Sequence, residues 1–107
     1  IETAMGYGTW LHGEAVAAGM VMAADLSQRL GSLRKDDVSR VVALLERTGL
    51  PVTVSGITAP RFIELMSMDK KAAAGRIRFI LLDRLGSAVI RGDVPQESLL
   101  ATLGANV

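Results

Sequence analysis

The chain contains no cysteine and no long hydrophobic run, and it holds only four aromatic residues. Without cysteine, neither a disulfide framework nor a thiolate metal site can form. The apolar run at residues 15–24 is shorter than the roughly 20 apolar residues that a membrane-spanning helix needs. The charges nearly balance at a net +1, so we expect neither nucleic acid nor a membrane as a partner.

What is present is the composition of one globular domain. Of the 107 residues, half are hydrophobic and 21% are charged, which suits a single domain with a modest core. Residues 1–5 include no basic region followed by an apolar one, so we expect no signal peptide and a cytoplasmic protein. The apolar Ile1 lacks a capping residue, and we interpret the start as a helix tail and the chain as a fragment of a larger protein.

Hydrophobic periodicity predicts two helices in the first half of the chain. One runs from about His12 to Leu30 and ends near Gly31, where glycine is a common helix stop. Its middle is apolar nearly all round, which predicts a central helix with neighbours on several sides. These apolar residues are Val16, Met20, Val21, Met22, Ala23 and Leu26. The second helix covers about Lys35 to Thr48, and its buried face is Val38, Val41, Val42 and Leu45.

The second half of the chain predicts a helix, a β-hairpin and a last helix. Thr58 can cap the third helix with Pro60 in its first turn. Residues 76–82 and 88–91 read as two strands around a turn at 85–87. Pro95 begins the last helix. The expected inward residues are Phe62, Leu65 and Met66 on the third helix and Leu99, Leu100 and Leu103 on the last. The expected fold is mainly α, with about four to five helices and one small hairpin.

His12 is the only histidine, and it stands at the predicted start of the first long helix. A neutral imidazole nitrogen is a good ligand for zinc. A catalytic zinc usually takes three protein ligands, so the others would be carboxylates or lie outside this chain. From spacing alone, a cap or a packed polar residue explains His12 as well. Glu14 is equally explained by the positive end of the helix dipole.

Basic residues offer a second candidate site. Asp69-Lys70-Lys71 follows the apolar face of the third helix, and lysine is a good point-charge partner for phosphate. Lysines at a helix C-terminus also complement the helix dipole. Four arginines around the hairpin could form a basic patch or simply protect the strand edges; they are Arg76, Arg78, Arg84 and Arg91. No glycine-rich phosphate loop follows a strand, so no nucleotide-binding motif is present.

Four segments, taken in order, resemble a known family. They are Ile1-Glu2, Leu11-His12-Gly13-Glu14-Ala15-Val16-Ala17-Ala18-Gly19-Met20, Met68-Asp69-Lys70-Lys71, and the hairpin segment Arg78-Phe79-Ile80-Leu81-Leu82 with Leu85-Gly86. Together they resemble the C-terminal domain of the 3-dehydroquinate synthase family, within the sugar phosphate cyclases. The resemblance covers nearly the whole chain, and the segment around His12 is its most specific part.

The resemblance implies a fold and an activity. In that family a helical C-terminal domain carries most metal and substrate contacts, beside an N-terminal domain that binds NAD and would be absent here. The implied enzyme is a lyase of the shikimate pathway, which supplies aromatic amino acid biosynthesis. It converts 3-deoxy-D-arabino-heptulosonate 7-phosphate to 3-dehydroquinate and releases phosphate. NAD oxidises a substrate hydroxyl transiently, while zinc acts as a Lewis acid.

The resemblance also implies roles for individual residues. His12 matches a zinc ligand, and either Lys70 or Lys71 matches a contact to the substrate phosphate, while Glu14 matches a motif position without an assigned role. The remaining zinc ligands and the whole NAD site would precede Ile1, so we expect the chain alone to be inactive. Expected partners are its own N-terminal domain, the phosphate substrate and a second copy in a homodimer.

Two other interpretations remain open at the level of sequence. The chain could belong to another sugar phosphate cyclase, such as one that makes aminocyclitol precursors, since these share the fold and the metal motif. It could also be a non-catalytic helical interaction module. In that case the apolar helix over residues 15–24 would form a dimer or partner surface.

Overall fold

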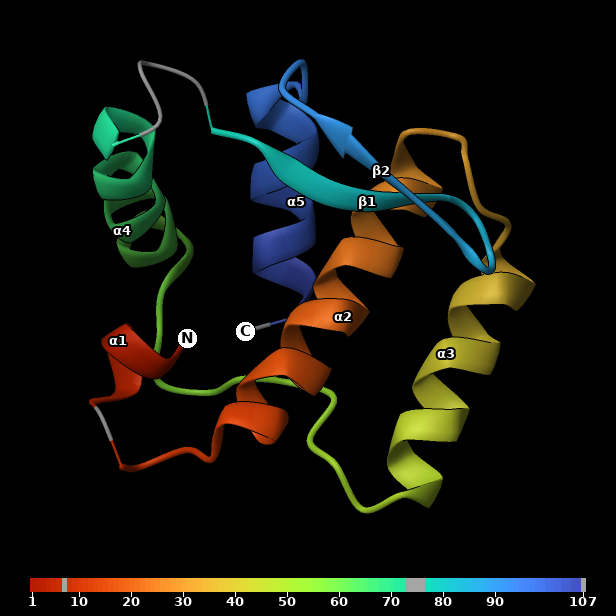
Figure 1. The fold of residues 1–107 in the computed structure, drawn as a ribbon, viewed down its shortest axis with the longest axis horizontal. Coiled ribbons are helices and arrows are strands. Elements are labelled where there is room, and N and C mark those ends of the chain that lie inside the picture. Colours follow the sequence, from red (N-terminus) through yellow and green to blue (C-terminus); the bar gives the residue numbers. More distant parts are fainter. Residues whose placement is uncertain (7, 73–76, 107) are drawn as a thin grey trace.

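The computed structural model describes residues 1–6, 8–72 and 77–106, without the side chains of residues 69–72. Within these ranges it contains five helices and one two-stranded antiparallel sheet (Figure 1). The elements are α1 (Glu2–Met5), α2 (His12–Arg29), α3 (Lys35–Arg47), α4 (Ala59–Ala72), β1 (Phe79–Arg84), β2 (Ser87–Arg91) and α5 (Gln96–Asn106). The predicted mainly-α fold with one hairpin is confirmed. None of the described helices is long and apolar enough to cross a membrane.

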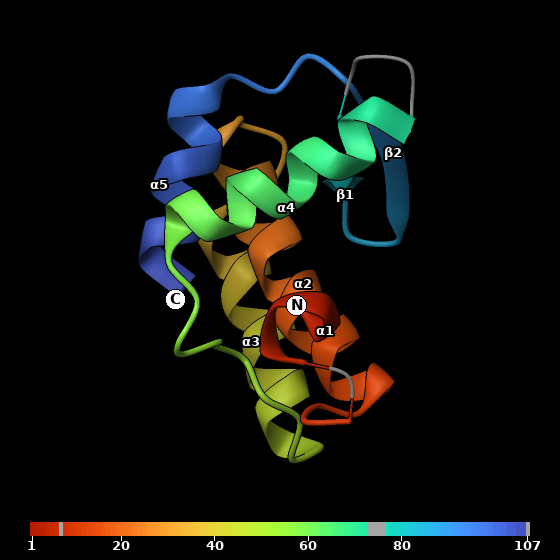
Figure 2. The same ribbon diagram turned by 90° about the vertical axis from the view of Figure 1, so that its left-hand side faces the viewer.

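Helix α2 is the central element of the fold. It contacts α3, α5 and β1, and in Figure 1 α3 and α5 flank it on opposite sides. Figure 2 shows α4 lying across the molecule, with α1 below it. Small residues such as Ala17, Ala18 and Ala24 are buried along α2. The run of small side chains therefore lets several elements pack closely around one helix.

The predicted central helix with neighbours on several sides is confirmed, but one face of α2 is left uncovered. Val16 and Met20 are 44% and 49% exposed, and residues four apart share one face of a helix. A related error concerns α5, where Leu99 and Leu103 are buried as predicted but Leu100 is 41% exposed. Leu99 and Leu103 are also four apart, and Leu100 lies about 100° around the helix from Leu99. Apolar character alone therefore did not identify the covered side.

The helix ends follow the predicted glycine stops. Gly31 and Gly49 have φ angles of +89° and +79°, a left-handed conformation that glycine adopts without steric cost. Next to them, the Ser32 amide donates to the Ser27 carbonyl at 2.9 Å and the Leu50 amide to the Leu45 carbonyl at 3.1 Å. This hydrogen-bond pattern ends many helices. It fixes the directions in which the chain leaves α2 and α3.

The hairpin packs on α2 through its inner side chains. Leu81 of β1 is buried, while Ile80 and its cross-strand partner Ile90 are exposed on the outer face. Ser27 of α2 ties the two elements together, because its Oγ donates to the Ala23 carbonyl at 2.7 Å and accepts from the Leu82 amide at 2.9 Å. The first strand begins at residue 79, later than predicted, and residues 73–76 lie outside the described residues.

The main core joins segments from both ends of the chain. Its buried members come from α2, the segment before α4, α4, β1 and α5; they are Ala18, Met22, Leu26, Val54, Ile57, Phe62, Leu81, Leu99 and Leu103. The Val54 amide donates to the Asn106 carbonyl at 3.2 Å, and Asn106 Nδ2 donates to Asp25 Oδ2 at 3.2 Å. Thr102 is buried in this region, and its Oγ1 has no hydrogen-bond partner within the described part of the chain.

Candidate functional site

His12 and Glu2 come together at the exposed end of α2. His12 is the first residue of α2 and Glu2 the first residue of α1, and the intervening turn brings His12 Nδ1 within 3.0 Å of Glu2 Oε2. The His12 side chain is 80% exposed, whereas the Glu2 side chain is 36% exposed. The imidazole therefore stands out into solvent while its carboxylate partner lies closer to the body of the protein.

The contact with Glu2 assigns the two ring nitrogens of His12 different roles. A carboxylate oxygen accepts hydrogen bonds, so Nδ1 is the nitrogen that donates. A neutral imidazole carries one hydrogen, and Nε2 then keeps its lone pair. Since the ring is largely exposed, that lone pair is available to a ligand such as a divalent metal.

Glu14 has a structural task in the same turn. Its Oε1 accepts a hydrogen bond from the Leu11 amide at 2.8 Å, which satisfies one of the backbone donors that a helix start leaves unpaired. Its position in the first turn also places a carboxylate at the positive end of the helix dipole. Glu14 thus helps to fix the start of α2, the element that carries His12.

The described residues by themselves do not form a complete metal site. No group of three or more His, Cys, Asp or Glu side chains converges anywhere within them. A catalytic zinc usually needs three protein ligands. His12, whose Nδ1 contacts a carboxylate and whose side chain is largely exposed, fits the chemistry of one ligand in a set completed by other residues.

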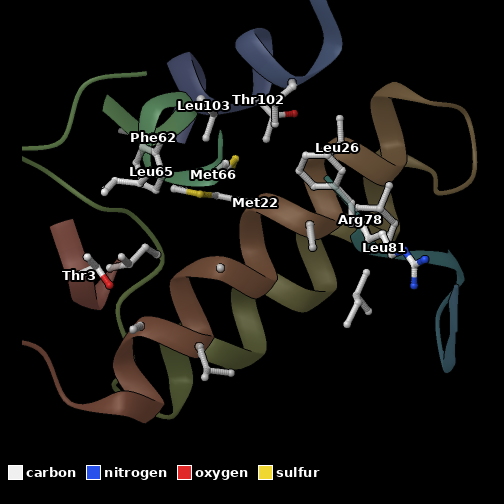
Figure 3. A pocket seen from close by; sticks show the side chains of 18 of the residues that line it. Thr3, Met22, Leu26, Phe62, Leu65, Met66, Arg78, Leu81, Thr102 and Leu103 are labelled. Carbon is white, nitrogen blue, oxygen red and sulfur yellow. The ribbon is translucent and has the colours of Figure 1, made fainter. Parts of the chain in front are cut away.

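An apolar groove of about 730 Å³ begins beside this site. It runs between α1, α2, α4 and β1, with Thr3 toward one end and Arg78 toward the other (Figure 3). Met22, Leu26 and Phe62 contribute to its apolar lining, and Glu2 reaches its edge. The half-exposed Val16 of α2 also lines this groove. Part of the uncovered face of α2, at Val16, therefore forms a wall of the groove.

The two predicted ligand groups lie toward different ends of the molecule. Lys70 and Lys71 belong to the last turn of α4, and their side chains lie outside the described residues. Figures 1 and 2 place the end of α4 far from the start of α2, where His12 stands. Glu2 and Met68 nevertheless line the same groove, so the groove connects the two regions.

The three described hairpin arginines have different surroundings. Arg91 makes two hydrogen bonds to Asp93, at 3.1 and 3.2 Å, and this partner raises the pKa of Arg91 through hydrogen bonding and charge. Arg78 lines the groove and Arg84 is exposed on β1. Arg76 lies outside the described residues. Arg78 is thus the cationic side chain of this group that the structure associates with the groove.

Sequence reasoning missed the contact between Glu2 and His12. The two residues are ten positions apart and separated by a glycine-containing turn, so no helical or strand period relates them. The signal that could have found the pair is chemical: a histidine that binds a metal usually donates its other ring N–H to a carboxylate or carbonyl. That rule directs a search for a nearby acidic side chain.

A family model and curated relatives match this chain. The model described as 3-dehydroquinate synthase C-terminal matches residues 1–72. The 3-dehydroquinate synthase of Nitrosomonas europaea is 55% identical over 107 residues, which is all of this chain and 29% of the relative. That of Acidithiobacillus ferrooxidans is 53% identical over 105 residues, covering 98% of this chain and 29% of the relative. The chain therefore spans under a third of the length of these relatives.

A solved structure shares the fold. It is a 2-epi-5-epi-valiolone synthase from Streptomyces hygroscopicus subsp. jinggangensis 5008, with NAD+ and Zn2+ bound. The TM-score is 0.86 and the sequence identity 28%, and the match covers 97% of this chain and 29% of that one. The arrangement of α2, the hairpin and α5 is thus the arrangement of a domain found in a larger cofactor-binding enzyme.

Proposed function

This chain belongs to the 3-dehydroquinate synthase family through that family's C-terminal domain, and we propose that it is the metal- and substrate-binding part of such an enzyme. The intact enzyme would convert 3-deoxy-D-arabino-heptulosonate 7-phosphate to 3-dehydroquinate with release of phosphate. The two dehydroquinate synthases described above are 53% and 55% identical to the chain, whereas the valiolone synthase is 28% identical. The difference favours dehydroquinate synthesis over the reaction of another sugar phosphate cyclase.

The observation that carries the proposal is the state of His12. It lies in the segment that matches the family, its ring is exposed, and its Nδ1 is engaged by Glu2 so that Nε2 remains for a metal. Zinc bound there would act as a Lewis acid toward the reacting oxygens of the substrate. The remaining zinc ligands and the NAD site would come from the part of the enzyme that precedes this chain, so the 107 residues alone give no turnover.

We place the substrate phosphate near the end of α4. Either Lys70 or Lys71 would supply a positive charge for it. Support comes from their position two and three residues after Met68, which lines the groove, and from the exposed Arg78, which lines the same groove. Replacing each lysine in turn by methionine in the intact enzyme should raise the KM of the phosphate substrate for one of them only. Equal, unchanged KM values in both variants would exclude the phosphate role.

We propose that the preceding part of the enzyme covers the groove. The chain spans 29% of the length of these relatives. The rest of such an enzyme would need a contact surface on this domain, and the groove offers one. The half-exposed Val16 and Met20 and the exposed Met68 are apolar side chains of the kind that such an interface buries. We also propose that the enzyme is cytoplasmic, as the sequence led us to expect. A second copy of the chain is the competing occupant of the groove. Crosslinking from a cysteine introduced at Val16 distinguishes them, since an intramolecular product supports the proposal and a dimer contradicts it.

The decisive experiment replaces His12 in the intact enzyme. We expect His12→Ala to lower the zinc content and to abolish release of phosphate from 3-deoxy-D-arabino-heptulosonate 7-phosphate. Lys35→Ala, an exposed residue at the start of α3, is the matched control and should keep both properties. Normal zinc content and turnover in His12→Ala would overturn the metal-ligand role. If the unsubstituted full-length protein itself lacked synthase activity, the non-catalytic interaction module would be favoured.

A further inference from the structure

We propose that Glu2 is a positioning residue that holds His12 in the ring orientation and tautomer needed to bind the metal. The inference rests on the proposed function, because it takes His12 as a metal ligand. It goes further in giving Glu2 a role of its own. Glu2 would not touch the metal or the substrate, and it would act entirely through Nδ1 of the imidazole.

The geometry provides the first argument. Glu2 Oε2 lies 3.0 Å from His12 Nδ1, which is a normal hydrogen-bond length between nitrogen and oxygen. A single contact of this kind selects one tautomer, because only the form with hydrogen on Nδ1 satisfies the carboxylate. It also limits rotation of a ring that is otherwise 80% exposed and that would have little else to fix it.

The support of Glu2 provides the second argument. Its helix, α1, is only four residues long, but Ile1, Ala4 and Met5 all pack against the main core. The Met5 amide donates to the Ile1 carbonyl at 2.9 Å and closes the turn. Core packing therefore fixes the backbone of Glu2, and Glu2 in turn fixes the exposed ring of His12.

The neighbouring carboxylate cannot replace Glu2. Glu14 lies two residues from His12, but its Oε1 accepts from the Leu11 amide at 2.8 Å and caps α2. The two acids therefore have different roles at this turn. Glu14 fixes the helix start and Glu2 fixes the ring, so removing Glu2 should leave the helix intact while the imidazole loses its preferred orientation.

The test measures zinc binding in the intact enzyme, using Zn²⁺ alone in competition with a chelator of known affinity. Loss of a partner that orients a metal ligand typically lowers the metal affinity by about 10–100-fold. We expect the zinc affinity of Glu2→Ala to fall within that range. Glu2→Gln should recover most of the affinity, because its amide oxygen can still accept from Nδ1. Glu46→Ala, an exposed acid on α3, should bind zinc like the parent.

A second readout separates positioning from general damage. With Co²⁺ in place of zinc, the visible absorption bands report the geometry around the metal, and we expect them to change in Glu2→Ala and to return in Glu2→Gln. Thermal unfolding is measured alongside. If the alanine variant does not fold, Glu2→Met takes its place in the comparison with the parent and Glu2→Gln. Methionine keeps the length of the side chain but offers no carboxylate or amide acceptor.

The outcomes distinguish this inference from the proposed function. Parent-like zinc affinity in Glu2→Ala together with lost zinc in His12→Ala would overturn the positioning role alone. Parent-like affinity in both variants would overturn the assignment of His12 itself. A glutamine variant as weak as the alanine variant would also contradict orientation through an accepted hydrogen bond.

Discussion

The two ends of α2 have opposite surroundings. At its N-terminal end, His12 and Gly13 are exposed, and Val16 and Met20 leave one face half uncovered. At its C-terminal end, Ala24, Leu26 and Ser27 are all buried beneath the hairpin and α5. The comparison teaches that the two ends of one helix have different roles, since its buried end stabilises the domain while its exposed end presents His12, the proposed metal ligand.

Separation of this kind has an energetic consequence. Substitutions at distant sites without shared partners usually add in their effects on stability. We therefore expect variants at the buried end to change the free energy of unfolding without altering the ligand chemistry directly. Variants at the exposed end should change metal binding and leave unfolding nearly untouched. The predictions below run from the largest expected change in unfolding free energy to the smallest.

Leu103→Ala should have the largest effect on stability. Leu103 is 1% exposed and packs in the main core against α2, and truncating a buried leucine costs about 2–5 kcal/mol because a cavity is left. Urea denaturation of the chain measures the loss. Leu100→Ala, three residues earlier on the exposed side of α5, is the control, and an equal loss there would mean that the buried face has been misassigned.

Ser27→Ala should come next. Its Oγ accepts from the Leu82 amide at 2.9 Å, and leaving a part-buried amide without a partner costs about 1–3 kcal/mol. Urea denaturation again measures the free energy of unfolding, and amide hydrogen exchange at Leu82 should become faster. The control Ser39→Ala, on the exposed side of α3, should leave the free energy of unfolding nearly unchanged. If Ser27→Ala also leaves it unchanged, the hydrogen bond between α2 and the hairpin does not stabilise the buried end.

Thr102→Val should change stability in the opposite direction. The Thr102 hydroxyl is buried without a partner in the described structure, and valine keeps nearly the same shape without the polar group. We expect a gain of about 1 kcal/mol, from the usual cost of an unpaired buried group. Thr48→Val is the matched comparison, because Thr48 Oγ1 donates to the Leu45 carbonyl at 2.7 Å and its loss should destabilise. A loss in Thr102→Val would indicate that the hydroxyl has a partner after all.

His12→Ala should have the smallest effect on unfolding. Substitutions at exposed positions usually stay within about 0.5 kcal/mol, and the His12 side chain is 80% exposed. Thermal unfolding of the chain without metal checks this. A destabilisation as large as that of Ser27→Ala would break the comparison, because the exposed end of α2 would then contribute to stability as the buried end does.

Patterns within single elements were readable from the sequence. The predicted bounds of α2 and α3 agree with the structure to within one residue, because glycine stops and hydrophobic periods are local signals. The hairpin followed from alternation and a turn. The exposure of Val16, Met20 and Leu100 was not predicted, because periodicity shows which residues share a face but not whether another element covers it.

The candidate site was harder to predict for a different reason. The assignment of His12 came from a family motif, while spacing alone left a structural explanation open. Its contact with Glu2 depends on how the turn between α1 and α2 folds back, which no periodic pattern encodes. The phosphate role of Lys70 or Lys71 stays a prediction, since their side chains lie outside the described residues.

The bond between the Val54 amide and the Asn106 carbonyl, together with the burial of Leu99 and Leu103 against α2, has a consequence for synthesis on the ribosome. Because domains are made from the N-terminus onward, α2 emerges long before the helix that completes its core. Until α5 leaves the exit tunnel, the side of α2 that α5 covers remains without a permanent partner. Chains released early would therefore expose the same surface that the finished domain hides, and they would be natural substrates for chaperones and proteases.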